Sequence, residues 1–296
     1  MDLSVIVSTY NKAEWLEKVL WGYLQQDFRD FELLVADDGS GENTRELIAK
    51  VARDSPFPVR HIWHPDDGYR RSIILNAAIV ASRHDYLVFS DGDCIPRSDF
   101  VRAHAELAEP GRFLSGGSVY LSMDVSRRIS TEDVASGRFA EPAWLREQGQ
   151  KLGRHRLRLV PRDWRAALLD RLTTTNPTWN LNNASTWRDW IFAANGMEAG
   201  MQYGGADRAL GSRLENLGLK GKRARFRAVL VHLDHDRPYK TKESIQKNKA
   251  IRRRIVSGGE TRARDGLEEM VERGMAGGFL EFGPGEPGGF EPDWNH

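Results

Sequence analysis

The stretch that decides the fold runs from Tyr86 to Cys94 and reads YLVFSDGDC. Its first part is apolar and rich in β-branched and aromatic residues, which is typical of a buried strand. The strand ends in Asp91 and Asp93, separated by Gly92, and open α/β sheets bind ligands at the carboxyl ends of their strands. Glycine lets a ligand approach the backbone, and two carboxylates can hold a divalent cation that neutralises a diphosphate. Taken alone, the motif also fits a solvated Asp-Gly turn.

Around this stretch, the first hundred residues alternate between strand and helix patterns. Apolar runs predict strands at residues 3–8, 31–36 and 59–63, in addition to 86–90, and helical spacing predicts helices at 14–26, 44–53 and 72–81. This alternation favours an α/β fold with a mostly parallel sheet and helices on both of its faces.

The rest of the chain is less regular. A strand is expected at 113–121, where Gly116 and Gly117 indicate a close backbone approach. Residues 126–177 are charged and poorly periodic, and we interpret them as an insertion or mobile cover. Helices are expected at 187–194 and 206–217 and a strand at 229–233, whereas the Gly- and Pro-rich sequence beyond Arg273 predicts a flexible tail.

Composition narrows the class of protein. The 296 residues carry 43 basic and 42 acidic side chains, so a formal charge of +1 gives no indication of a nucleic-acid partner. A single cysteine, Cys94, excludes an internal disulfide framework and suits a reducing compartment. No window approaches the roughly 18 apolar residues of a membrane span, and the N-terminus enters a strand at once. We therefore expect a cytoplasmic protein that is soluble or at most peripheral to the inner face of the membrane.

Polar residues follow three of the expected strands. Ser8-Thr9-Tyr10-Asn11 follows the first, Asp37-Asp38 the second and Asp91-Gly92-Asp93 the fourth. Parallel strands bring their carboxyl ends to one edge, so these groups would line one crevice suited to a nucleotide. Asp37-Asp38-Gly39-Ser40 is equally explained as a turn with a helix cap. The chain has neither a P-loop motif nor the glycine fingerprint of dinucleotide sites.

In this order and spacing, the motifs resemble the family 2 glycosyltransferases, which have the GT-A fold. Tyr69-Arg70-Arg71 with Leu75-Asn76 is similar to a nucleotide-contacting segment of that family. The later motifs resemble a galactosyltransferase-type C-terminal module: Asn183-Ala184-Ser185, Asn195-Gly196 and Tyr203-Gly204-Gly205-Ala206-Asp207. The resemblance covers roughly residues 3–121 and 179–240.

The resemblance implies that different parts of the chain have different functions. Residues 1–121 would form the nucleotide-sugar-binding half of a GT-A domain, 122–178 an irregular insertion or cover, and 179–240 the acceptor and catalytic half. Residues 241–296 would form a helical extension and the Gly/Pro-rich tail. The implied nucleotide pocket comprises Thr9, Tyr10, Asn11, Asp37 (on the uracil of a uridine sugar), Asp38, Tyr69, Arg71, Asp91 and Gly92.

The same resemblance implies the catalytic and metal-binding residues. Asp207 matches the catalytic base, although Ala206 replaces the family's usual Glu, which puts sugar specificity in doubt. Asp93 would bind Mn²⁺ or Mg²⁺ together with His232 or His235. A mixture of carboxylate and imidazole suits Mn²⁺ better than an all-oxygen Mg²⁺ site. Because positions i and i+3 of a strand face opposite ways, we expect one ligand and one structural histidine unless a turn intervenes.

The expected activity is a metal-dependent, inverting transfer of a sugar from a nucleotide-diphosphate donor, a UDP-sugar, to a glycan or lipid-linked glycan. By family analogy, its pathway would be surface polysaccharide or lipopolysaccharide assembly. The alternatives are a non-catalytic nucleotide-sugar-binding module or regulatory subunit, which Ala206 favours, and a nucleotidyltransferase, whose Gly-rich N-terminal loop is missing.

Two further groups of residues leave alternatives open. Arg154 to Arg158 could contact an anionic membrane or a lipid-linked acceptor, or form a solvated charged loop. Trp179, Trp187 and Trp190 could stack on sugar rings, although large aromatic residues are more often part of the core.

Overall fold

The computed structural model describes residues 1–236, 241–273, 280–282 and 288–289. Within them, one ten-stranded sheet has the order β10-β9-β3-β2-β1-β4-β7-β6-β8-β5. The strands are β1 (Leu3–Thr9), β2 (Phe31–Asp37), β3 (Val59–Trp63), β4 (Tyr86–Asp91), β5 (Cys94–Pro96), β6 (Arg112–Tyr120), β7 (Asn183–Trp187), β8 (Lys220–His232), β9 (Leu280–Phe282) and β10 (Gly288–Gly289).

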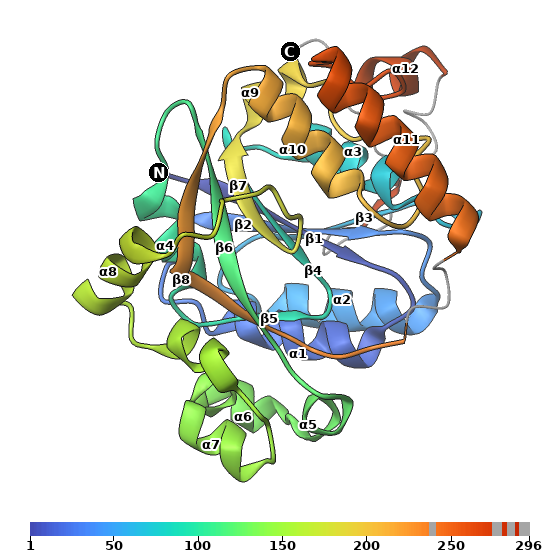
Figure 1. The fold of residues 1–296 in the computed structure, drawn as a ribbon. Helices are drawn as coiled ribbons and strands as arrows, with labels where there is room; N and C mark the ends of the chain where they lie inside the picture. Colours follow the sequence, from blue (N-terminus) through green and yellow to red (C-terminus); the bar gives the residue numbers. More distant parts are fainter. Residues whose placement is uncertain (237–240, 274–279, 283–287, 290–296) are drawn as a thin grey trace.

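The helices alternate with the early strands and then follow in groups (Figure 1). They are α1 (Ala13–Leu24), α2 (Glu42–Asp54), α3 (Arg71–Ala81), α4 (Phe100–Leu107), α5 (Met123–Arg128), α6 (Thr131–Ala135), α7 (Pro142–Glu147), α8 (Trp164–Leu172), α9 (Arg188–Ala193), α10 (Ala206–Asn216), α11 (Lys242–Gly258) and α12 (Leu267–Glu272). Two 3₁₀ helices, η1 (Arg138–Ala140) and η2 (Gly153–Leu159), complete the set.

The first half of the sheet has the predicted parallel arrangement. β1 lies between β2 and β4, and β3 extends the sheet beyond β2, all in parallel. The registers pair Thr9 with Asp37 and Ser8 with Asp91, so the polar strand ends meet at one edge as expected. All seven residues of β1 and of β2 are buried, which explains their nearly continuous apolar sequence.

The second half of the sheet is mixed. β7 is antiparallel to both β4 and β6, β6 is parallel to β8, and β5 is antiparallel to β8. The α/β prediction is confirmed, but from β4 through β7, β6 and β8 to β5 only the β6–β8 pair is parallel. β7 was not expected, because its sequence, Asn-Ala-Ser-Thr-Trp, lacks an apolar run.

Gly116 and Gly117 confirm the expected close approach. A side chain on Gly116 would collide with Asn183, and one on Gly117 with the carbonyl oxygen of Arg225, only 1.9 Å from an ideal Cβ. The register between β6 and β8 shifts at this point. These glycines therefore let two strands and a buried amide pack where larger residues would not fit.

Helices cover both faces of the sheet, as predicted. α1 and α2 pack against one face in a core that includes Leu16, Leu20 and Ile48. α3, α9 and α10 pack against the other, with Ile74, Ile191 and Leu210 in the core. The C-terminal helical extension is also present as α11 and α12, which lie over α10 and α3 in Figure 1.

Residues 122–178 are not irregular. They form four short α-helices and two 3₁₀ helices, with local stop and start signals such as the capping box of Ser130 and Asp133 and Pro142 at the start of α7. Helices of five to nine residues are too short for apolar periodicity to reveal them. Of the expected flexible tail, 280–282 and 288–289 form β9 and β10, and the remainder lies outside the described residues.

Candidate active site

Arg71 joins the ends of β1 and β4. Its Nε donates to Ser8 Oγ at 2.9 Å, Ser8 Oγ donates to Asp91 Oδ1 at 3.0 Å, and the guanidinium pairs directly with the Asp91 carboxylate. Burial lowers the pKa of Arg71, but the negative charge of Asp91 outweighs this and the pKa is raised overall. About a quarter of each charged side chain is exposed, so a positive charge held by a carboxylate faces this edge of the sheet.

Asp93 meets two histidines at the end of β8. β5 pairs with β8 so that Cys94 lies opposite His232, and the backbone N–H of Leu233 donates to the carbonyl of Asp93 at 2.8 Å. This register places His232 Nε2 3.7 Å and His235 Nε2 2.8 Å from the Asp93 carboxylate. β8 ends at His232, so the chain turns before His235 and the two rings stack 5.9 Å apart. Contrary to our expectation, both histidines face the carboxylate.

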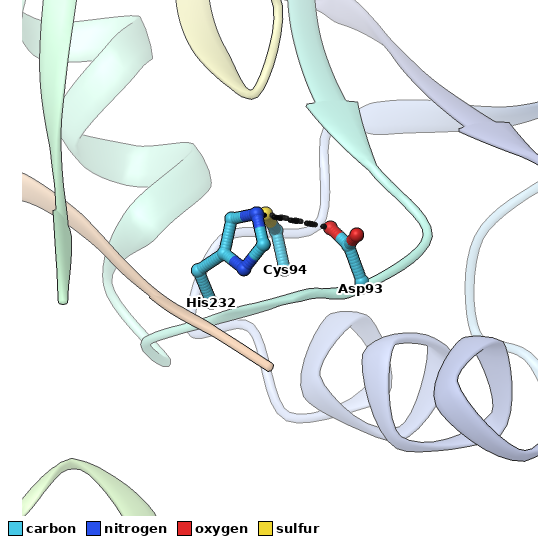
Figure 2. A group of neighbouring side chains, drawn as sticks. All are labelled: Asp93, Cys94 and His232. Atoms are coloured by element: carbon cyan, nitrogen blue, oxygen red, sulfur yellow. Dashed lines mark hydrogen bonds and ion pairs between the residues drawn. The ribbon is translucent and has the colours of Figure 1, made fainter. Parts of the chain in front are cut away.

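The donor atoms suit a divalent metal. Nδ1 of His232 lies 2.7 Å from the carbonyl of Leu233, and Nδ1 of His235 lies 2.9 Å from that of Asp236. A carbonyl can only accept, so each Nδ1 carries a hydrogen and Nε2 points toward Asp93, which is how metal-binding histidines are usually held. Asp93, Cys94 and His232 also bring potential ligand atoms within 4.8 Å of one another (Figure 2). Carboxylate and imidazole donors in this arrangement fit a divalent metal ion.

The two carboxylates of the Asp91-Gly92-Asp93 motif have different surroundings. Burial raises the pKa of Asp93, but the hydrogen bond from His235 and the charges of both histidines outweigh it and hold the pKa at about 2. For Asp91 burial dominates, and its pKa is raised despite the Arg71 charge. The motif is therefore a built polar site and not a solvated turn.

The carboxylates of Asp37 and Asp38 both make hydrogen bonds within the protein. Asp37 is fully buried; it accepts from the backbone N–H of Ser40 at 2.9 Å and contacts His61 Nε2 at 2.8 Å. Asp38 contacts His64 Nε2 at 2.8 Å and accepts from the backbone N–H of Arg70 at 3.0 Å, and burial raises its pKa. Asp37 thus has the turn-capping role that its sequence left open, and its contact with uracil stays a prediction.

Thr9, the last residue of β1, and the residues that follow it lie at this edge of the sheet. Thr9 Oγ1 is buried, with no hydrogen-bond partner among the described residues. Tyr10 is exposed and donates to Asp66 at 2.9 Å, whereas Asn11 adopts a positive φ of 46° and binds the start of α2 through Ser40 and Gly41. The backbone N–H of Gly92 donates to the carbonyl of Ser8 at 2.8 Å, so a larger residue there would crowd Thr9.

Asp207 lies in the first turn of α10, which follows a left-handed Gly205. It is half-buried, and its negative charge contributes to raising the pKa of Arg71, which indicates that the two side chains are near each other. Tyr69 and Tyr203 bring the two flanking loops together through an edge-to-face contact at 6.4 Å. The structure therefore brings the predicted base to the side of the site that carries Arg71.

Two neighbours of the site were not predicted. Tyr120, half exposed at the end of β6, packs on His232 with ring centroids 4.8 Å apart, because the two residues are register partners. His64 contacts Asp38 and follows β3 directly. Both stand at strand ends on the same edge, which is the signal that could have identified them.

The remaining candidates have structural roles. Trp179 is fully buried between Phe89 and Phe113, and Trp187 packs edge-on against Tyr86, so both belong to the core; Trp190 is partly buried against it. In the 154–158 segment, Arg158 donates to the carbonyl of Ser118, whereas Arg154, Arg156 and Leu157 are exposed. The segment is thus anchored at one end and open to solvent at the other.

Comparison with known proteins identifies the family. The sequence pattern of Glycosyl transferase family 2 matches residues 4–162, more than half of the chain, and this stretch includes β1, the Asp-Asp pair and the Asp91-Gly92-Asp93 motif. The chain belongs to this family.

Curated relatives are similar over part of their length only. The chondroitin synthase of Escherichia coli is 31% identical over 106 residues, which is 36% of this chain and 15% of that protein. An uncharacterised glycosyltransferase of Nostoc sp. is 31% identical over 93 residues, or 31% of this chain and 28% of that protein. The validoxylamine A glucosyltransferase of Streptomyces hygroscopicus is 28% identical over 103 residues, or 34% and 24%. The matched stretches therefore span less than a third of these relatives.

Solved structures share the fold at low sequence identity. The mannosyltransferase PcManGT of Pyrobaculum calidifontis, in complex with GDP-Man and Mn²⁺, aligns with a TM-score of 0.53 at 20% identity over 80% of this chain and 58% of that one. S. aureus TarS 1–349, in complex with UDP-GlcNAc, aligns with a TM-score of 0.57 at 12% identity over 91% and 69%. The expected GT-A architecture is confirmed.

The membrane prediction can be examined for the described helices. None of them combines the length and apolar character that crossing a bilayer requires.

Proposed function

We propose that this chain is a metal-dependent, inverting glycosyltransferase that moves a sugar from a nucleotide-diphosphate donor, a UDP-sugar, to a hydroxyl group of a glycan or lipid-linked glycan. The observation that carries the proposal is the cluster of Asp93, His232 and His235, whose ligand atoms face one another beside the Arg71–Asp91 pair. Such a combination of a metal-binding set and a positive side chain suits a diphosphate.

The residues around this cluster have roles in donor binding. Thr9 and Tyr10 are proposed to contact the nucleotide, and the exposed ring of Tyr10 can cover it. Arg71 donates toward the diphosphate from its fixed position on Ser8 and Asp91. Asp38 and Tyr69 complete the pocket, and Gly92 leaves room for the ribose. Asp37, at the end of β2, is the residue proposed to contact the uracil, beside Asp38.

Asp207 is the proposed general base. Its carboxylate takes the proton from the acceptor hydroxyl while the acceptor oxygen forms a bond to the anomeric carbon. The bond from that carbon to the diphosphate oxygen breaks, the nucleoside diphosphate leaves with the bonding electrons, and the anomeric configuration inverts. Mn²⁺ or Mg²⁺ held by Asp93 and the two histidines would supply positive charge against the leaving diphosphate. The positive guanidinium of Arg71 stabilises the same negative charge of the leaving diphosphate.

Three further features of the proposal rest on resemblance. Residues 179–240 resemble a galactosyltransferase-type module, which would form the acceptor side with Asp207. A cytoplasmic location and a role in surface polysaccharide or lipopolysaccharide assembly follow from the same analogy. The names of the relatives, a chondroitin synthase and a glucosyltransferase among them, support sugar transfer as the class of activity.

Calorimetric titration of UDP and GDP into the protein, with and without Mn²⁺, tests the donor site. The proposal expects UDP to bind more tightly with Mn²⁺, and His232→Ala or His235→Ala to remove the Mn²⁺ effect without unfolding the protein. A panel of UDP-sugars with Mn²⁺ should then show slow hydrolysis or transfer of one sugar.

The outcomes separate the candidate functions. Mn²⁺-dependent binding of UDP together with turnover supports a glycosyltransferase. Binding of the same strength without turnover of any sugar, in the presence of glycan acceptors, favours the non-catalytic module to which Ala206 points. Absence of Mn²⁺-linked nucleotide binding overturns the proposed site.

A further inference from the structure

The outward face of α8 is apolar although nothing in the described part of the chain covers it. Trp164 is 72% exposed, Leu168 44% and Leu172 65%. They recur at intervals of four residues and so occupy an arc of roughly 80° on the helix. Exposed apolar side chains are ordinary when scattered, but three aligned on a nine-residue helix form a patch of the kind that marks an interaction surface.

The opposite face of α8 anchors the helix to β8. Ala166 and Asp170 are buried, and Asp170 accepts from the backbone N–H of Phe226 at 3.1 Å and from Arg227 Nε at 2.7 Å. Asp163 caps the first turn by accepting from the backbone N–H of Arg165. The helix is therefore fixed in one orientation, and its apolar side is held outward. Figure 1 shows it at the periphery of the molecule, beside β8.

Positive side chains flank the apolar arc. Arg165 lies on one side of it and Arg171 on the other, and both are exposed. On the Arg171 side, a cavity of about 260 Å³ opens between α8 and the strands β6 and β8. Its lining includes the basic residues Arg112, Arg171, Lys222, Arg223 and Arg227 and the acidic residue Asp170.

These charges are only partly neutralised. Glu109 pairs with Arg112 and Lys222, and Asp170 pairs with Arg227. Arg223 donates to the carbonyl of Thr175, which leaves its positive charge uncompensated by that contact.

We propose that α8 is a docking helix for an anionic phospholipid bilayer, with Trp164, Leu168 and Leu172 inserted at the interface and the arginine-lined cavity receiving a lipid phosphate. A Trp/Leu face flanked by arginines is the pattern of helices that lie in a membrane interface, and arginine stems can extend toward head groups. Charge complementarity selects this occupant, because a neutral protein surface or a second basic copy of this patch would leave the arginines unmatched.

The docking surface is separate from the nucleotide site. Asp170 holds β8 at Phe226 and Arg227, whereas His232 ends the same strand five residues beyond Arg227. At the rise of an extended strand, this is a separation of roughly 15–20 Å. Membrane binding can therefore be measured, and can fail, independently of sugar transfer.

Vesicle flotation of the full chain without any donor tests the proposal. Wild-type protein should float with vesicles of phosphatidylcholine mixed with phosphatidylglycerol and stay at the bottom with phosphatidylcholine alone. The combined variant Trp164→Ser, Leu168→Ser, Leu172→Ser should reduce binding at least tenfold, and so should the combined variant Arg171→Glu, Arg223→Glu. The matched control carries Val256→Ser and Arg253→Glu on the exposed side of α11 and should bind like the wild type.

Three outcomes would overturn the proposal. One is wild-type protein that fails to float with anionic vesicles. A second is loss of flotation in the arginine variant alone, which would leave an anion cavity without membrane insertion. The third is a dimer seen by sedimentation velocity that the Trp164, Leu168 and Leu172 variant abolishes while vesicles bind neither protein. Far-UV circular dichroism and Mn²⁺-dependent UDP binding, unchanged in every variant, would show that the fold and the nucleotide site are intact.

Discussion

The two halves of the central sheet are built from different kinds of residue. β3, β2, β1 and β4 run parallel and are rich in Val, Ile and Leu, with a buried ion pair between Arg60 and Glu32. In β7, β6 and β8 the interior combines apolar residues such as Phe113 and Val231 with a buried polar cluster and small residues. Asn183 donates to the carbonyls of Gly117 and Ala228, and His104 contacts both Asn183 and Ser185.

The difference shows why the site lies where it does. The parallel half supplies a row of strand ends, which is a general place for polar groups, and the second half supplies the particular residues that complete it. Asp93 follows β4, and it meets His232 only because β5 pairs with the end of β8. The nucleotide edge is therefore a property of the first half, and the proposed metal site is a property of the contact between the two.

Asp93→Ala is the most severe test of that contact. The variant removes the carboxylate that both histidines face, so sugar transfer should fall by on the order of 10³-fold or more, to the detection limit. Stabilisation of the protein by UDP with Mn²⁺ should also disappear in thermal unfolding experiments. Asp85→Ala, at the opposite end of β4 where the side chain is 78% exposed, is the matched control and should retain both. Normal turnover in Asp93→Ala would refute the metal assignment.

Asp207→Asn separates catalysis from donor binding. The amide keeps the shape of the carboxylate but cannot take a proton, so turnover should drop by roughly 10²–10⁴-fold. The affinity for the donor nucleotide, measured by calorimetry, should barely change because the base contacts the acceptor.

The alternative role for Asp207 is stabilisation of the α10 N-terminus, worth well under roughly 1 kcal/mol. Asp189→Asn, in the first turn of α9, measures that effect alone. If Asp207→Asn behaves like this control in the transfer assay, Asp207 is a helix-end residue and not the base. If binding and turnover are lost together, it belongs to the donor site.

The same contrast decides what the sequence could predict. The strands and helices up to Asp91 were predicted to within three residues at each end, because apolar periodicity reports burial in a parallel sheet. β7 was missed because Asn183, Ser185 and Thr186 are buried through hydrogen bonds that periodicity cannot register. The first nine residues of β8 were missed because that stretch is rich in Lys and Arg.

The candidate site was predictable to a similar degree. Asp91 and Asp93 could be named from a motif at a strand end and Asp207 from its resemblance to a family motif, and their roles stay predictions. The orientation of His232 and His235 could not, because it depends on where β8 ends and on two backbone carbonyls. The contact between Asp37 and His61 could not be predicted either, since it joins β2 and β3 diagonally: His61 is the register partner of Val35, two residues before Asp37.

His104 should make stability depend on pH. It is fully buried, and burial lowers its pKa from 6.5 to about 4. The unfolded chain therefore binds a proton between pH 6.5 and 4 that the folded chain does not, so the free energy of unfolding falls as the pH falls through this window. At pH 4, this proton uptake by the unfolded chain lowers the free energy of unfolding by roughly 3 kcal/mol. Urea unfolding of wild type and His104→Asn at several pH values should show a shallower slope for the variant. Equal slopes would mean that His104 is protonated without cost.

Gly117→Ala tests how specific the packing of the second half is. The new methyl group would lie 1.9 Å from the carbonyl oxygen of Arg225, a backbone atom that cannot rotate away. The variant should lose about 1–3 kcal/mol of unfolding free energy in urea titrations. Gly41→Ala in the first half is the matched control, because its nearest neighbour is 3.9 Å away and its φ is −76°. That change should alter stability by less than about 1 kcal/mol. Similar losses in both variants would remove the distinction between the halves.

Cys94→Ser is expected to have the smallest effect, and it shows which atoms belong to the metal site. Cys94 lies on β5 opposite His232, is fully buried, and its Sγ donates to Asp93 Oδ1 at 3.2 Å. A serine hydroxyl can make the same hydrogen bond, so the unfolding free energy should change by no more than about 1 kcal/mol. If Asp93 and the histidines provide the donor atoms, Mn²⁺-linked binding of UDP should also be retained, because Mn²⁺ has little preference for sulfur. A variant of normal stability that no longer responds to Mn²⁺ would instead add the sulfur atom to the donor set. Cys94→Ala distinguishes the remaining possibility: if only this variant weakens Mn²⁺ binding, the thiol acts by orienting the Asp93 carboxylate.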